Sequence, residues 1–490
     1  MRDPTMSDPT VPITGLRGGL GGLAVAHDRA RALAATFDGA GNRMRGWAGT
    51  GGRVLRNGDL LESSLLSPVS FADAELAVLE ATTGPDGILV ESVSWETDAL
   101  LIRSSVWAYE STDQLVAGSF EVLDYAAGRL LGVTLAVGLP TVITTGLLGW
   151  GLYSVLPPPL QREAREAADD GSESLQRWLT EHPGVVERLA NGGGGLVDGF
   201  WTGVSRQPWI GPDGDVSFHP TTESAAGLLA GFFPDDGTPG VERRDDLAPD
   251  REAPTSVAAL MATLEQVAAL SGTPDSPDNG TVEVQTISGA RGPVHVVYLP
   301  GTDDMATTPW SADDDVRDMP TNLLAVSGAS TSYADGILEA MRRAGVEPGD
   351  PVLLVGHSQG GIMAAHLAAQ QGTYDVTGVV TAGSPVAGQG PYPESTHVLS
   401  LEHHGDVVPL ADGGRNADAA NHVTVTFDDG SASGVAGHHD LAHYVAGGAA
   451  VDASDDPTLL AELARLEEAG FLRRDGDASS QVFQISRRPG

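Results

Sequence analysis

The stretch that most constrains this chain is a short apolar run followed directly by a Gly-x-Ser-x-Gly motif. Residues 352–355 are all apolar, Gly356-His357-Ser358-Gln359-Gly360-Gly361 comes next, and a helical pattern of apolar residues begins at Ile362. A strand that turns sharply into a helix exposes the serine hydroxyl at the tip of the turn, and glycine is needed where the two backbones crowd together. A chain with 63 glycines can contain a Gly-x-Ser-x-Gly motif by chance. The position of the motif between a predicted strand and a predicted helix is therefore stronger evidence than the motif itself.

Length, charge and the absence of cysteine bound the possible functions. A chain of 490 residues is predicted to form two or three domains. The net charge of −38 argues against nucleic-acid partners, which require basic surface, and against attraction to anionic lipid headgroups. With no cysteine, the chain has no disulfide, thiol nucleophile or thiolate metal ligand. The first thirty residues lack the charged-then-apolar pattern of a secretory signal.

Residues 1–129 are predicted to form an α-helical bundle. Apolar residues recur at helical spacing in three segments: one that begins with residues 32–37, one at 71–82 and one at 88–124. Gly46-Trp47-Ala48-Gly49 lies between the first two segments and is expected to be a turn, and Tyr109 precedes Asp113 by four residues. A Trp-x-Gly turn with a Tyr-x-x-x-Asp tail resembles the helical-hairpin substrates of the actinobacterial type VII secretion route. The alternative is an ordinary bundle in which the Trp and Tyr are core residues.

Residues 130–156 form the longest uncharged stretch of the chain. Its 27 residues exceed the roughly 20 that cross a bilayer, but glycines and Gly138-Leu139-Pro140 interrupt it. The segment is therefore expected to be either a transmembrane helix or a buried helical hairpin. The first option, and the type VII resemblance, imply a membrane-associated or non-classically exported protein; the alternative is a cytoplasmic one. Residues 157–254 are expected to be an irregular or helical connector that ends in a Pro-rich, charged linker.

Residues 255–490 alternate between helical patterns and short apolar runs. The runs predict strands at 282–287, 294–299, 352–355, 376–382, 397–402 and 422–427. Helices are expected before, between and after them, at 256–271, 333–344, 362–371, 440–446 and 458–469. Short apolar strands separated by helices are typical of a mainly parallel sheet covered on both faces. An α/β fold preceded by a separate helical region is thus the predicted architecture.

Residues suited to activate Ser358 follow it in the chain. A serine hydroxyl needs a general base within hydrogen-bond reach, and the base needs an acid to orient it. Asp406 stands just past the predicted strand 397–402, and His438, His439 and His443 follow the strand 422–427. This is the order nucleophile, acid, histidine, each near a strand end. The spacing leaves open which of the three histidines serves as the base.

Oxyanion stabilisation requires preformed N–H donors beside the serine. The backbone N–H of Gln359, the residue after the serine, is one candidate. The other is Thr302, which follows the predicted strand 294–299 and the small residue Gly301.

Other polar groups in this region receive structural interpretations. We expect Ser384 to stabilise its own turn, His357 to pack beside the serine, and the run 313–315 to be a solvated acidic loop. His403 and His404 with Asp406 lack a further ligand at typical spacing, so no metal site is predicted.

Taken together, four motifs resemble the lipase-like branch of the α/β-hydrolase superfamily, nearest in layout to class 3 lipases and related actinobacterial serine hydrolases. They are Gly301-Thr302, Gly356-His357-Ser358-Gln359-Gly360-Gly361, Gly383-Ser384-Pro385 and Asp406-Val407-Val408-Pro409. The resemblance implies Ser358 as nucleophile, Asp406 as acid, and Thr302 with Gln359 as oxyanion donors. His439 is favoured as base because His-Asp with a following Tyr resembles the family's closing segment, and His438 is the alternative. Pro300 stands where the family usually has arginine.

The expected activity is hydrolysis of a carboxylic ester through an acyl-serine, without cofactor or metal. The loops 302–332 and 383–396 are expected to set the substrate range, and their apolar members suit a neutral or acyl ester, including a lipid: Met305, Trp310, Val386 and Tyr392. An acyltransferase or thioesterase would use the same triad. The alternative of another class is a non-catalytic membrane- or secretion-associated interaction protein. The oligomeric state is not indicated by the sequence.

Overall fold

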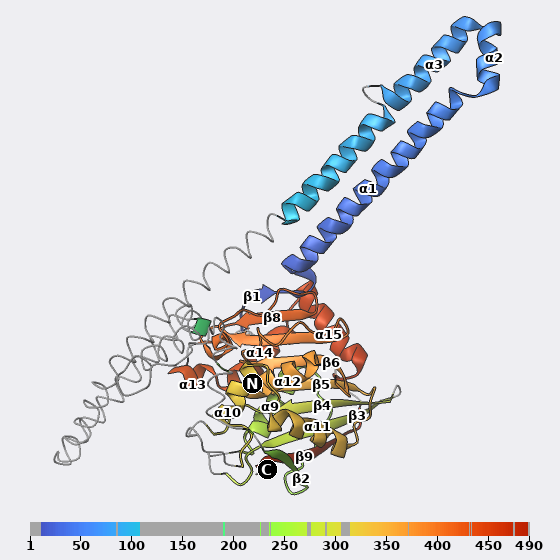
Figure 1. Ribbon diagram of the computed structural model, residues 1–490. Coiled ribbons are helices and arrows are strands. Elements are labelled where there is room, and N and C mark those ends of the chain that lie inside the picture. The colour runs from blue at the N-terminus through green and yellow to red at the C-terminus, as the bar shows by residue number, and fades with distance from the viewer. Residues whose placement is uncertain are drawn as a thin grey trace, which may run out of the picture. The chain divides into compact units, whose positions relative to one another are not determined.

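The computed structural model describes two compact units. The described residues are 11–84, 87–107, 190–191, 226, 235, 237–271, 276–289, 292–304, 314–370, 372–430, 432, 434–473 and 476–488 (Figure 1). Residues 22–119 belong to one unit and the remaining chain to the other. The segments 130–156 and 109–113, singled out in the sequence, lie outside the described residues. Within the described ranges, no helix is both long enough and apolar enough to cross a membrane.

The first unit is helical. It contains α1 (Leu23–Val54), α2 (Gly58–Leu66), α3 (Pro68–Thr83) and a further helix at 88–107. Phe37 packs edge-on against Trp95, with ring centroids 5.1 Å apart, and Ala34 and Ala99 are fully buried. The buried side chains are few and small, so much apolar surface of these helices stays exposed, including Leu66 at 89%.

The predicted turn at residues 46–49 is wrong, because these residues lie inside the 32-residue helix α1. Trp47 is 59% exposed, so it is neither a turn residue nor a core residue. Glycine disfavours a helix by about 1 kcal/mol per residue, which is why the segment suggested a break. In the described part of the chain, no atom beyond the adjacent helix residues lies within 4 Å of a Cβ built at Gly46 or Gly49, and the close packing occurs at the flanking Gly41 and Gly51. A Cβ on Gly41 would lie 2.9 Å from the carbonyl oxygen of Ser92, and one on Gly51 would lie 2.3 Å from Thr82.

The second unit is built on a nine-stranded mixed sheet with the order β1-β8-β7-β6-β5-β4-β3-β9-β2 (Figure 1). The strands are β1 (Ile13–Arg17), β2 (Thr238–Arg243), β3 (Thr281–Gly289), β4 (Gly292–Leu299), β5 (Pro351–His357), β6 (Asp375–Ala382), β7 (His397–His403), β8 (His422–Phe427) and β9 (Ala478–Arg488). β4 to β8 run parallel, and the remaining pairs are antiparallel. All six strands predicted from apolar runs are present.

Helices cover both faces of this sheet. They are α9 (Val257–Ala268), α10 (Met319–Val326), α11 (Ser332–Ala344), α12 (Gln359–Ala369), α13 (Gly434–His438), α14 (Leu441–Asp452) and α15 (Pro457–Ala469), with 3-10 turns at η1 (Gly19–Gly21) and η2 (Val408–Leu410). Leu353 and Val355 of β5 pack with α9, α14 and α15, whereas Val352 and Leu354 pack with α10, α11 and α12. Alternate residues thus enter two cores, which explains why the central strands are apolar throughout.

Two edge strands come from segments outside the predicted range 255–490. β1 pairs with β8, and β2, from a segment interpreted as linker, pairs with β9. Edge strands need no continuous apolar run, because only part of their surface is covered. The Pro- and charge-rich composition of residues 234–254 therefore concealed β2. β9 at the chain end was not predicted either.

Gly18, directly after β1, offers a test of the β1 pairing. Its φ is +77°, and an added Cβ would lie 1.9 Å from the carbonyl oxygen of His422 on β8. We expect Gly18→Ala to lower the free energy of unfolding by about 3 kcal/mol, because it adds a clash to left-handed strain. Gly349→Ala is the matched control: its φ is +95° with open space around the site, so about 1–2 kcal/mol is expected. Equal losses in urea unfolding would contradict the pairing.

His422 at the start of β8 predicts a pH dependence. Its ring is buried, Nε2 lies 2.9 Å from Ser400 Oγ, and burial together with Arg17 lowers its pKa to about 4. The unfolded chain takes up this proton near pH 6.5, so stability falls as pH drops from 6.5 to 4. His422→Gln should remove up to about 3 kcal/mol of that loss. Unfolding of both proteins between pH 4 and 7 tests this, with the exposed His404→Gln as control; unchanged slopes would refute it.

Candidate functional site

Ser358 occupies a strained turn between β5 and α12. Its φ of 52° and ψ of −120° make it the one non-glycine residue with positive φ in the described part of the chain. Its N–H donates to the carbonyl oxygen of Ala382 on β6 at 3.0 Å. Added Cβ atoms would lie 2.3 Å from Gly360 O at Gly356, and 1.9 Å from Leu299 O at Gly360. Glycine at both positions lets the chain turn sharply here, and strain of this kind is typical of functional sites.

A buried carboxylate lies at the end of the strand two places along the sheet from β5. The Asp406 side chain is fully buried after β7, and its Oδ2 lies 2.6 Å from Nδ1 of His439. The hydroxyl of Tyr444 donates to the same oxygen at 2.5 Å, and the N–H of Val408 donates to Oδ1 at 2.9 Å. Burial and the neighbouring Asp406 raise the pKa of Tyr444 well above its usual value, so the phenol stays protonated and donates.

His357 connects the turn at Ser358 to His439. Its Nε2 lies 3.0 Å from the carbonyl oxygen of His439, and the two ring centroids are 4.4 Å apart. Loss of hydration and the neighbouring His439 hold the pKa of this half-buried imidazole well below its usual value. His357 is therefore neutral, and its Nε2–H donates to the carbonyl. Sequence reasoning assigned it only a packing role; the structure shows that it also anchors the backbone of His439.

Glycines on two further strand ends bring the same residues together. An added Cβ at Gly383, after β6, would lie 2.9 Å from Oδ2 of Asp406 and 3.0 Å from Cε1 of His439. One at Gly301, after β4, would lie 3.0 Å from Cβ of Ser358. Consecutive parallel strands thus place their following loops at one edge of the sheet.

The two predicted oxyanion donors are Gln359, which follows Ser358 in the chain, and Thr302, which follows Gly301. Gln359 is the first residue of α12, where backbone N–H groups have no partner within the helix, and its side chain is held by the carbonyl oxygen of Asp318 at 2.9 Å. Oγ1 of Thr302 accepts a hydrogen bond from Asn322 at 2.8 Å. Both residues are therefore fixed by contacts outside the turn.

Of the three histidines left open by the sequence, His439 is the one hydrogen-bonded to Asp406. His438 stacks on His403 with ring centroids 5.3 Å apart, and His443 bonds Asp429 through Nδ1 at 2.7 Å. The grouping of His403 and His404 with Asp406 does not form. His404 is exposed, and the ring of His403 faces Asp429 instead.

Two structural expectations for the loops are corrected. Asp315 was expected to be solvated, but it is half-buried, accepts the N–H of Arg317 at 2.9 Å, and has a raised pKa because of burial and the nearby Asp303. Tyr392 was expected to face substrate, but its ring packs against His422 at the opposite end of the strands, with centroids 5.6 Å apart.

The four remaining loop residues differ in outcome. Oγ of Ser384 bonds the carbonyl oxygen of Ala382 at 3.0 Å, so this serine stabilises its turn as expected. Val386 is buried. Met305 and Trp310 lie outside the described residues.

Sequence reasoning missed Arg317, which holds the loop carrying Thr302. This arginine is 1% exposed and donates through one terminal nitrogen to the carbonyl oxygen of Gly301 at 3.2 Å. The other terminal nitrogen pairs with Asp303 and Ser271. In the sequence, Arg317 stands among acidic residues with no motif around it. Only its burial in the structure shows that it supports the loop of Thr302.

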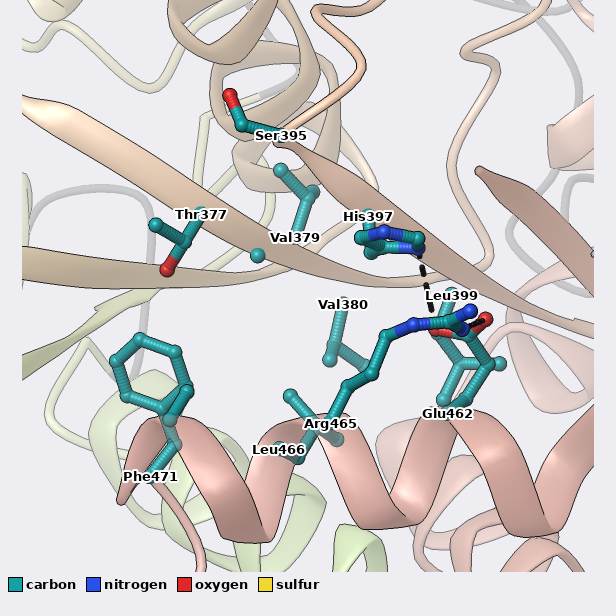
Figure 2. A pocket seen from close by; sticks show the side chains of 12 residues that line it. Thr377, Val379, Val380, Ser395, His397, Leu399, Glu462, Arg465, Leu466 and Phe471 are labelled. Carbon is teal, nitrogen blue, oxygen red and sulfur yellow. Dashed lines mark hydrogen bonds and ion pairs between the residues drawn. The ribbon is translucent and has the colours of Figure 1, made fainter. Parts of the chain in front are cut away.

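A cavity of about 170 Å³ lies away from this site (Figure 2). Figure 2 shows its walls, which come from β6, from β7 and the residues before it, and from α15 and the residues after it: Thr377, Val379, Val380, Ser395, His397, Leu399, Glu462, Arg465, Leu466 and Phe471. Ser358 and Asp406 follow the opposite, carboxyl ends of their strands. The cavity is therefore not the space in which Ser358 would meet a substrate.

Comparisons with known proteins do not assign a family. No family model, no curated protein and no solved structure matches this chain.

Tyr444 provides a test of the hydrogen bonds around Asp406. We expect Tyr444→Phe to lower the free energy of unfolding by about 1–3 kcal/mol, because the buried carboxylate loses a donor. Tyr333→Phe is the matched control. Its ring is equally buried, and its hydroxyl has no hydrogen-bond partner among the described residues, so the loss should be near zero. Equal effects of the two substitutions in urea unfolding would count against the described network.

Proposed function

We propose that this protein is a serine hydrolase that cleaves carboxylic esters through an acyl-enzyme intermediate, on an α/β-hydrolase fold. The observation that carries the proposal is the bond between His439 and the buried Asp406, at the sheet edge where the strained turn presents Ser358. The motif order seen in the sequence supports the lipase-like branch. Its Gly301-Thr302, Gly-His-Ser-Gln-Gly and Gly383-Ser384 segments all follow adjacent parallel strands.

In the first step, Nε2 of His439 accepts the proton of the Ser358 hydroxyl while Oγ attacks the ester carbonyl carbon. His439 faces Asp406 with Nδ1, so the proton on Nδ1 is held there and Nε2 is left as the basic nitrogen. Asp406 then stabilises the positive charge that forms on the imidazole. Tyr444 and Val408 keep the carboxylate in position for this role.

The backbone N–H groups of Gln359 and Thr302 would bind the oxyanion of the tetrahedral intermediate. Gln359 also lies at the N-terminus of α12, the positive end of the helix dipole. As the intermediate collapses, His439 gives its proton to the departing alkoxide and the ester C–O bond breaks. Water, deprotonated by His439, then releases the acid from Ser358 by the same route.

The substrate class follows from charge. A chain with a net charge of −38 repels strongly anionic molecules, so neutral acyl esters, including lipids, are favoured. Acyl transfer and thioester cleavage use the same three residues, and product analysis in the presence of an added alcohol separates transfer from hydrolysis.

A second candidate function belongs to the helical unit. Leu65, Leu66 and Val69 near the junction of α2 and α3 are more than 70% exposed, which favours contact with a partner or membrane. If binding through these residues were the protein's only function, the site around Ser358 would have no catalytic activity.

Covalent labelling distinguishes the two. A fluorophosphonate probe should label the wild-type chain and leave Ser358→Ala unlabelled, because only an activated serine reacts. Asp406→Asn and His439→Gln should lower kcat/KM for a p-nitrophenyl ester by about 10⁴-fold. His404→Gln is the control, since this histidine is exposed and outside the site. A folded wild-type chain that neither reacts with the probe nor hydrolyses the ester would refute the proposal.

A further inference from the structure

A second cluster of ionisable side chains lies close to Asp406. His403 is the last residue of β7, Asp429 follows β8, and His443 belongs to α14. Oδ1 of Asp429 lies 3.0 Å from Nε2 of His403 and 2.7 Å from Nδ1 of His443. The possible ligand atoms of the three residues all lie within 4.8 Å of one another. Within the described part of the chain, no other group of three His, Asp or Glu meets this condition.

The ring of His403 is buried without completing its hydrogen bonds. The residue is 2% exposed, and its Nε2 has no hydrogen-bond partner in the described structure, although the carboxylate of Asp429 is close. Its Nδ1 accepts only a long bond of 3.2 Å from the N–H of Gly405. Nε2 of His403 is thus a buried polar atom that lies near a carboxylate but makes no hydrogen bond with it. Buried polar atoms in proteins nearly always have a partner, so this one requires an explanation.

The three donors suit a transition-metal ion of the zinc type. Two imidazole nitrogens and one carboxylate oxygen are ligands that Zn²⁺ binds at about 2.0–2.2 Å, whereas Mg²⁺ and Ca²⁺ prefer oxygen alone. In a tetrahedral site, such ligand atoms lie about 3.3 Å apart. Oδ1 of Asp429 already lies 3.0 Å from Nε2 of His403 and 2.7 Å from Nδ1 of His443, close to that spacing.

We propose that His403, Asp429 and His443 form a binding site for a zinc-class divalent ion, beside the serine site and independent of its activity. Nε2 of His403, Nδ1 of His443 and a carboxylate oxygen of Asp429 are the ligands, and the fourth position opens to solvent. His443 and Asp429 are partly exposed, with 20% and 14% of their side chains accessible, so an ion can enter from the surface.

Binding has a defined consequence for the imidazole protons. When the ion occupies Nε2 of His403, the ring proton moves to Nδ1, and the Gly405 N–H loses its acceptor. The same exchange moves the His443 proton to Nε2. Gly405 directly precedes Asp406, so the ion and the carboxylate share one loop.

Metal content and affinity test the site. We expect the untagged full chain, freed of metal with EDTA, to bind about one Zn²⁺ by isothermal titration calorimetry. His443→Gln and Asp429→Asn should weaken binding by about 100-fold or more, because each loses a ligand. His404→Gln, next to His403 but outside the cluster, should bind as the wild type does. Equal affinities in all four proteins, or no saturable binding by the wild type, would overturn the proposal.

A second measurement on the wild-type chain does not depend on the variants folding. Diethyl pyrocarbonate modifies accessible imidazoles, so Zn²⁺ should protect His443 and leave His404 reactive, as read by peptide mass spectrometry. Co²⁺ should show the visible absorption of a four-coordinate site, and Mg²⁺ should neither protect nor compete. Unchanged modification of His443 in saturating Zn²⁺ would also overturn the proposal.

Discussion

The carboxylate of Asp406 is a negative charge held out of water, and the geometry of the candidate site depends on how that charge is satisfied. A buried carboxylate is strongly unfavourable unless hydrogen bonds or an opposite charge stabilise it. Here three groups do so: the N–H of Val408, the phenol of Tyr444 and the imidazole of His439. They come from the β7 loop, α14 and the residue after α13. Satisfying one charge therefore ties the end of a strand to two helices.

Close approach of backbones is the second constraint on the site. Four successive parallel strands end at the same edge of the sheet, and the loop after each one must pass within contact distance of the next. Side chains at Gly301, Gly356, Gly360 or Gly383 would collide with neighbouring atoms. The turn at Ser358 is strained, and the hydrogen bond from its N–H to Ala382 holds it in place. The glycines thus allow the loops to approach one another closely, and the register of the parallel strands places the loops at the same edge.

The histidine-rich segment around α13 and α14 divides between two carboxylates. His439 and Tyr444 turn toward Asp406, whereas His443 turns toward Asp429, where it meets His403. Residues adjacent in sequence, such as His443 and Tyr444, point in different directions along a helix, so neighbours serve different acids. One short segment can therefore contribute to two sites, and the ring of His438 stacks on His403 and His443.

The sequence by itself determined the six central strands, the helices between them, the sharp turn at Ser358 and the order of the candidate residues. Each of these features follows from the local spacing of apolar residues or from glycines at fixed positions, and both signals act over only a few residues. Only the tertiary structure decided that residues 46–49 continue a helix, that β1 and β2 complete the sheet, that Arg317 is buried, and that His439 rather than His438 or His443 meets Asp406. These outcomes depend on partners distant in the chain, because packing, edge pairing and side-chain direction are set by the neighbours that folding brings into contact.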